Sequence, residues 1–171
     1  TWTIADSPVM IIGDVTVPSG SSLTISPGVA VLFTGPYRFT VNGTLNATGT
    51  SVQPIFFTRA AETDESRWHG IRFESANDSS ILEHCIIQHV YKYDSYYQNV
   101  RGGGVLIDSC SPTIRHCLIS NTFTRNDNRN GAGGGIYITG GSTSLIEYNQ
   151  IADNESDSGG GINVGGESWP V

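Results

Sequence analysis

The chain has 171 residues and a formal net charge of −7, and a chain of this length can build one domain with a substantial core. Charged residues make up only 15% of it and hydrophobic residues 37%, whereas glycine contributes 21 residues and lysine only Lys92. The scarcity of strong helix formers argues against a helical bundle. The acidic balance argues against a nucleic-acid partner, and no apolar run is long enough to span a membrane.

The first 67 residues predict short β-strands separated by tight turns. Apolar and β-branched residues alternate in brief runs, and clusters of Pro, Gly, Ser and Asn separate them. Such punctuation is typical of strands joined by turns. The strands expected here are 15–17, 23–25, 29–33, 39–41 and 55–57.

A repeat begins near residue 68. Glycine triplets at 102–104, 133–135 and 159–161 each precede an alternating strand, and an earlier copy, Trp68-His69-Gly70, precedes another. A second strand follows in the first three copies, within 81–87, 113–119 and 145–151. Matching positions in these second strands recur every 32 residues, as at Cys85, Cys117 and Asn149. A period of this kind indicates a stack of similar structural units.

The repeat predicts an all-β solenoid, a parallel β-helix in which each copy is one coil that pairs with its neighbours. Helical periodicity is missing from the copies, and a propeller blade needs four strands per repeat. We expect six to seven coils with little or no helix, in a single domain over 1–171. Residues 1–67 form the shorter coils and 68–171 the regular coils with long loops. Because the chain begins without Met, we expect it to be a piece of a larger protein.

Alternation along the strands predicts which side chains face the core. Those expected to point outward are Arg72, Leu106, Tyr137 and Asn163, with Glu74, Asp108 and Thr139 at the strand ends.

The sequence resembles the right-handed parallel β-helix proteins of the pectate-lyase-like superfamily. The resemblance covers nearly the whole chain and lies in 13–20 (GDVTVPSG), 24–29 (TISPGV), 41–45 (VNGTL) and the later Gly-Gly-Gly-Ile copies. It implies a right-handed coil. The superfamily holds polysaccharide lyases, hydrolases and epimerases as well as adhesins, so the fold alone does not give the function.

Two positions in the second strands stack similar side chains from coil to coil. Cys85 and Cys117 are expected as a buried internal stack with Asn149, although neighbouring coils lie close enough for a disulfide. His84 and His116 should stack on the outside of one turn with Tyr148 next to them. Two imidazoles are weak candidates for a metal site, because zinc needs three or four ligands.

Two long segments, 91–101 and 123–130, are expected as loops that form a wall beside the strands after the glycine triplets. Insertions in a solenoid often mark its binding face. Tyrosine rings pack against sugar C–H surfaces, so this wall predicts a glycan groove; packing of the tyrosines onto the coil is the equal alternative. The candidate ligand-binding residues are Tyr91, Tyr93, Tyr96, Tyr97, Arg101, Tyr137 and Asn163.

Catalytic residues are less clear. In the lyases that the chain resembles, a basic residue removes the proton next to a uronate carboxylate, and carboxylates hold calcium. The candidates are Arg72, Glu74, Asp108 and Lys92, yet no two of them form a diagnostic motif. A hydrolase needs two carboxylates at a fixed separation, and Glu74 and Asp108 look too close for inverting geometry.

Two functions therefore stay open. The first is an extracellular or cell-surface module that binds a glycan, adhesin-like and without catalysis. The second is a polysaccharide lyase or, less favoured, a glycoside hydrolase acting on an acidic polymer. We expect no cofactor, with calcium the one ion left open. The expected partner is a polysaccharide or surface glycan, and the open last coil predicts end-to-end self-association.

Overall fold

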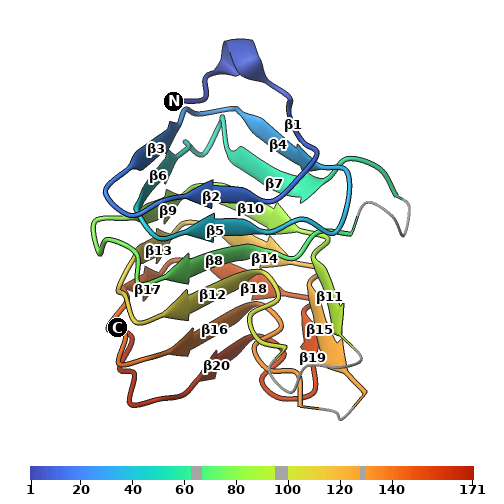
Figure 1. Cartoon of the computed structure of the whole chain (residues 1–171), viewed down its shortest axis with the longest axis vertical. Coiled ribbons are helices and arrows are strands. Elements are labelled where there is room, and N and C mark those ends of the chain that lie inside the picture. The colour runs from blue at the N-terminus through green and yellow to red at the C-terminus, as the bar shows by residue number, and fades with distance from the viewer. Residues whose placement is uncertain (63–66, 95–99, 128–129) are drawn as a thin grey trace.

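A computed structural model describes residues 1–62, 67–94, 100–127 and 130–171. The chain coils through three parallel sheets in a fixed order and stacks each coil on the previous one, which confirms the predicted parallel β-helix (Figure 1). Within these described ranges the one helical element is a short 3-10 turn, η1 (Ile4–Asp6), at the N-terminal end. No helix in the described part of the chain is long and apolar enough to cross a membrane.

We call the first sheet the groove sheet, because its outer face carries the candidate site. Its six strands are β2 (Val15–Val17), β5 (Phe39–Val41), β8 (Ile71–Glu74), β12 (Val105–Asp108), β16 (Ile136–Thr139) and β20 (Ile162–Val164). The second sheet holds β3 (Ser22–Ile25), β6 (Thr44–Thr48), β9 (Ile81–Glu83), β13 (Thr113–Arg115) and β17 (Ile146–Glu147). The third holds β1 (Val9–Ile11), β4 (Ala30–Phe33), β7 (Ile55–Arg59), β10 (Cys85–Gln88), β14 (Leu118–Ser120) and β18 (Gln150–Ala152).

The two segments that the sequence predicted as a wall of loops each begin with a strand, and these strands belong to a fourth sheet. Strands β11 (Tyr91–Asp94), β15 (Phe123–Asn126) and β19 (Glu155–Ser156) pair in parallel beside the three main sheets (Figure 1). Aromatic and β-branched side chains favour this pairing, and Tyr91 stacks on Phe123 with ring centroids 4.7 Å apart. We call this element the side sheet.

One apolar column fills the inside of the coils. The inward residues of the groove sheet, such as Ile71, Val105 and Ile136, are fully buried. Cys85 and Cys117 join the column as predicted and are free thiols, with the amide of Cys85 3.5 Å from Sγ of Cys117. Asn149 continues that stack, and its Oδ1 accepts a hydrogen bond from the amide of Cys117 at 2.9 Å.

Leu106 and Tyr137 point outward as predicted, but neither side chain is exposed to solvent. Their exposed fractions are only 4% and 6%. The chain passes over them at the first glycine of each triplet. A Cβ at Gly102 would lie 2.7 Å from Cβ of Leu106, and one at Gly133 would lie 2.7 Å from Cβ of Tyr137. Both glycines have positive φ, so the triplets let the chain turn closely over the sheet.

Candidate functional site

The open part of the groove sheet lies over its first three strands. Thr16, Thr40 and Arg72 are register neighbours on the outer face of β2, β5 and β8. In the next two coils the corresponding side chains, Leu106 and Tyr137, are covered. A ligand that lies on this sheet therefore meets polar side chains mainly on β2, β5 and β8.

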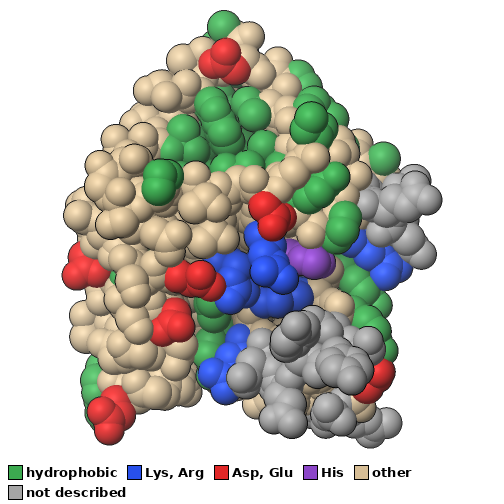
Figure 2. Space-filling view, in the orientation of Figure 1, with side chains coloured by type: hydrophobic (Ala, Val, Ile, Leu, Met, Phe, Trp, Pro, Cys, Tyr) green, Lys and Arg blue, Asp and Glu red, His purple; other side chains and the backbone are tan. Residues whose placement is uncertain are grey.

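A basic cluster stands over this open face. Burial of the His69 imidazole, together with the positive charges of Arg38, Lys92 and Arg72, lowers the pKa of His69 to about 4, although Asp14 opposes the shift. We call Arg38, His69, Arg72 and Lys92 the basic cluster. Figure 2 shows Lys and Arg side chains gathered around a histidine at the middle of this face, with acidic side chains beside them. The cluster is a local positive region on a protein whose net charge is −7.

Backbone contacts fix the upper part of the basic cluster. The amide of His69 donates to the carbonyl of Tyr37 at 2.9 Å, which places the imidazole beside the segment that leads into β5. The amide of Arg38 donates to Oδ1 of Asp14 at 2.9 Å. The carboxylate of Asp14 is thus held by the backbone near the cluster.

Two candidate catalytic residues form an ion pair. Nη2 and Nε of Arg72 lie 2.7 and 2.8 Å from Oε1 of Glu74, so the carboxylate is held beside its own strand. Asp108 is the register partner of Glu74 on β12 and accepts a hydrogen bond from Oγ of Ser109 at 2.8 Å. Glu74 and Asp108 are neighbours on one sheet, as the sequence predicted, and they do not face each other across a cleft.

Lys92 joins the side sheet to the groove. Its Nζ donates to the carbonyl of Arg101 at 2.6 Å. The guanidinium of Arg101 lies 5.0 Å from the ring centroid of Tyr137, a cation–π distance. These two contacts bring Lys92, Arg101 and Tyr137 close together. Tyr137 lies beneath the guanidinium of Arg101, and Lys92 lies on the side of the basic cluster.

The tyrosines of the wall do not line the groove as one set. Tyr91 carries the guanidinium of Arg67 at 3.8 Å on its ring and stacks on Phe123. Tyr93 is 46% exposed, and its hydroxyl donates to the carboxylate of Asp127, a hydrogen bond that raises the pKa of Tyr93. Tyr96 and Tyr97 lie outside the described residues.

Asn163 and the histidine pair lie apart from the cluster. Asn163 is on β20, two strands beyond β12, and its Nδ2 donates to Oγ of Ser158 at 3.1 Å. His84 and His116 stack at 4.9 Å on an outer turn with Tyr148 next at 5.1 Å, as predicted. Within the described ranges, no group of three or more His, Cys, Asp or Glu side chains is placed to hold a metal ion.

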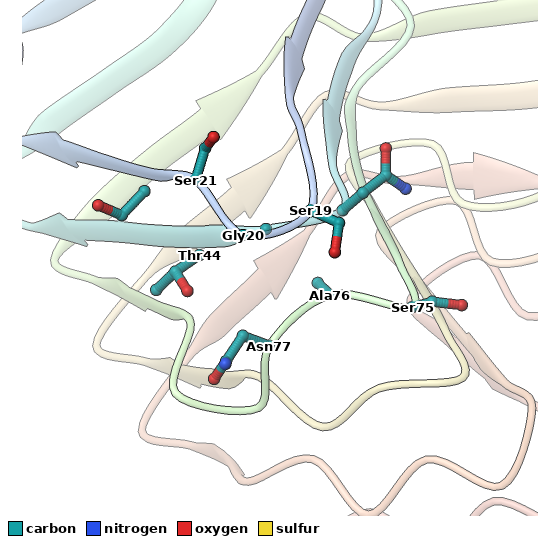
Figure 3. Close-up of a pocket in the computed structure, with 10 residues that line it drawn as sticks. Ser19, Gly20, Ser21, Thr44, Ser75, Ala76 and Asn77 are labelled. Atoms are coloured by element: carbon teal, nitrogen blue, oxygen red, sulfur yellow. The ribbon is translucent and has the colours of Figure 1, made fainter.

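A polar pocket lies at the other end of the same three strands. The turn at Ser75–Asn77, after β8, is longer than the tight turn at Asn42–Gly43 after β5, so it projects and forms a shelf (Figure 3). The pocket above it has a volume of about 440 Å³ and is lined by hydroxyl, amide and small side chains: Ser19, Gly20, Ser21, Ser22, Asn42, Gly43, Thr44, Ser75, Ala76 and Asn77. None of these side chains is charged, so the pocket suits hydroxyl groups better than ions.

Neither His69 nor Arg38 was predicted from the sequence as a site residue. The sequence does hold one signal for His69. This residue occupies the middle position of the triplet, which is glycine in the later copies at Gly103, Gly134 and Gly160. At Gly103 and Gly134 a Cβ would collide with the next coil, lying 2.1 Å from the carbonyl oxygen of Gly134 and 2.4 Å from that of Gly160. A side chain at this position is therefore an exception that only the first copy accommodates.

Comparisons with protein-family models, with curated proteins and with solved structures found no match to this chain. The interpretation of the site therefore rests on its own residues.

Proposed function

We propose that this protein is an extracellular or cell-surface β-helix module that binds an acidic polysaccharide on the outer face of β2, β5 and β8. The observation that carries the proposal is the basic cluster. Three cationic side chains converge on a half-buried, neutral histidine on an otherwise acidic molecule. Positive charge concentrated in one place attracts anionic ligands despite an opposite net charge.

The surroundings of the cluster suit a sugar polymer. Threonine hydroxyls on β2 and β5 and the polar pocket beyond them offer hydrogen bonds to sugar hydroxyls. A strand rises about 3.3 Å per residue, so the three residues of β5 separate the cluster from the pocket by about the length of two sugar units. A uronate or sulfate group would lie at Arg38 and Arg72, and neutral hydroxyls would reach the pocket.

Lyase activity is the second candidate, and His69 is the observation that favours it. Its imidazole is unprotonated at neutral pH and stands among cations that would hold a uronate carboxylate. In that reaction His69 would take the proton on the carbon next to the carboxylate, the bond between the adjacent carbon and the glycosidic oxygen would break to leave a carbon–carbon double bond, and the departing oxygen would take a proton from water. A pKa of about 4 makes His69 a weak proton acceptor at neutral pH, whereas efficient bases have a pKa near the working pH. Binding is therefore our first proposal.

The test is a binding panel of a polyuronate, a sulfated polysaccharide and a neutral glucan. We expect the acidic polymers to bind and the neutral one not to, with affinity falling as salt rises. Arg38→Gln and Arg72→Gln should each weaken binding about tenfold, the loss expected for a charge-assisted hydrogen bond. Arg115→Gln is the matched control, because Arg115 lies on the second sheet in an ion pair with Glu83.

Two outcomes decide between the candidates. Release of ultraviolet-absorbing unsaturated products from the polyuronate, abolished by His69→Gln, would establish the lyase. Equal binding of neutral and acidic polymers, or full binding by Arg38→Gln and Arg72→Gln, would refute the proposed site.

A further inference from the structure

The charged side chains on the outer face of the groove sheet are ordered along its strands. Strands β5, β8 and β12 are parallel and in register, so all of them begin on one side and end on the other. Arg38 comes directly before β5, and His69 comes two residues before β8. Glu74 and Asp108 are the last residues of β8 and β12. Figure 2 shows acidic side chains to the left of the Lys and Arg group, the direction in which these strands run in Figure 1.

Carboxylates outnumber cations where these strands end. Glu74 offsets the charge of Arg72, since its Oε1 lies 2.7 Å from Nη2 of that residue. Asp108 makes no ion pair with any side chain in the described part of the chain. Burial and, to a smaller extent, the charges of Asp78 and Asp108 raise the pKa of the Cys110 thiol, so these two carboxylates lie at the same corner. The strand ends are therefore a negative region on the far side of Arg72 from the basic cluster.

The polar pocket lies beside these carboxylates, because its shelf at Ser75–Asn77 runs from Glu74 to Asp78 in the chain. Five hydroxyl groups in its lining form no hydrogen bond with the described part of the chain: those of Ser19, Ser21, Ser22, Thr44 and Ser75. A hydroxyl group can both donate and accept, which suits the hydroxyl groups of a neutral sugar unit. The pocket volume of about 440 Å³ lies within the range of ligand pockets, roughly 300–1,000 Å³.

We propose that the groove selects a glycan in which an acidic unit is joined to neutral units, with the acidic unit at the basic cluster and a neutral unit in the polar pocket. This inference rests on the proposed function, because it takes the basic cluster as the place of the acid group. A second acidic unit at the strand ends would bring its charge close to those of Asp78 and Asp108, and like charges at short range repel. A fully charged polyuronate is therefore a poorer ligand than the same backbone with fewer carboxylates, and Asp108 is a specificity-determining residue.

The test is isothermal titration calorimetry with a short oligoglucuronate in three forms: fully charged, with half of its carboxyl groups reduced to alcohols, and with all of them reduced. The three forms share one backbone and one linkage, so they differ only in charge. We expect the half-reduced form to bind about three- to tenfold more tightly than the fully charged form, because hydrogen bonds in the polar pocket replace repulsion at the strand ends. The fully reduced form should bind most weakly, because it has no group for the basic cluster.

Two pairs of variants locate the selection. Asp108→Asn removes a charge but keeps an oxygen that accepts the hydroxyl of Ser109, and it should tighten binding of the fully charged form about threefold. Asp153→Asn, at an exposed carboxylate after β18, is its matched control and should change nothing. Thr44→Val removes a pocket hydroxyl and should weaken binding of the half-reduced form about threefold. Thr24→Val, on β3 but outside the pocket lining, should bind as the original chain does.

The outcomes separate this inference from the proposed function. Affinity that rises steadily with the number of carboxylates, or an Asp108→Asn variant that binds the fully charged form no better, would overturn the inference and leave the basic cluster as a site for acidic glycans. Unchanged binding of the half-reduced form by Thr44→Val would overturn the place given to the neutral unit. If no charged form binds, or if the fully reduced form binds as well as the others, the proposed function itself is refuted and the inference with it.

Discussion

His69 couples the site to the stability of the fold. Its pKa of about 4 in the folded chain lies below the roughly 6.5 of an unfolded histidine. Between these values the unfolded chain takes up a proton that the folded chain does not, so stability is lost as the pH falls through this range. We expect a loss on the order of 2 kcal/mol, allowing for the partial exposure of the ring. Urea unfolding at pH 7, 5 and 4 measures it.

The variant His69→Gln isolates this effect from the titration of carboxylates. It removes the ionisable group and keeps the backbone hydrogen bond to Tyr37. The stability difference between the original chain and the variant should change in favour of the variant as the pH falls from 7 to 4. Parallel losses in both proteins would show that His69 is not held neutral by its surroundings.

The direction of individual side chains could be predicted from the sequence, whereas their coverage by other segments could not. Alternation correctly placed Ile71 and Val105 inside, because strand geometry fixes the side of each residue. It placed Tyr137 outside, which is the right direction, but it could not show that the chain at Gly133 and the guanidinium of Arg101 lie over this side chain. The basic cluster was missed because Arg38, His69 and Lys92 lie far apart in the sequence, and only the coiling of the chain brings them together.

At the scale of elements, the glycine triplets let neighbouring coils approach closely. A Cβ at Gly103 would lie 2.1 Å from the carbonyl oxygen of Gly134 and 2.5 Å from Oγ1 of Thr124. Gly103→Ala must therefore separate two coils or move the side sheet. We expect it to lower the free energy of unfolding by more than about 2 kcal/mol, measured by urea unfolding at neutral pH.

Gly13→Ala is the matched control, because nothing lies within 4 Å of a Cβ at that position. Its effect should stay within about 0.5 kcal/mol. If the two substitutions cost the same, close contact between coils is not what requires the triplets.

The side sheet was the element hardest to predict. Its strands follow those of the third sheet after two residues, as β11 follows β10, so the sequence shows one long segment without a clear turn. The alternation of Tyr91, Lys92 and Tyr93 separates two faces, with Lys92 toward Arg101 and the two tyrosines toward Arg67 and Asp127. The sequence predicts a single wall of the groove for all three residues, and the structure divides them between the two faces of the side sheet.

At the scale of the whole molecule, the two ends of the solenoid differ. At the N-terminal end the inward residues Val17 and Ile25 are no more than 4% exposed, and the ring of Trp2 packs edge-on against Phe39. At the other end Ile162 and Val164 are 42% and 46% exposed, although the equivalent residues one coil earlier are fully buried. Strand β20 pairs only with β16 among the described strands. At the N-terminal end β1, β2 and β3 likewise pair with one described strand each, so the difference between the ends is that the inward side chains are covered at the first coil and exposed at the last.

An open edge with an apolar face favours association with another copy. Because the exposed inward residues Ile162 and Val164 lie together at the C-terminal end, two copies would meet through the same face and the assembly would close as a pair, without growing into filaments. We expect sedimentation velocity to show a monomer–dimer equilibrium that shifts to the dimer as concentration rises. Val164→Asp should keep the protein monomeric, because a charge on the open face is costly to bury. Val52→Asp, at a valine that is 86% exposed on a turn, should dimerise normally. A monomer at every concentration, or filaments in place of dimers, would contradict the assignment of this end as a self-association surface.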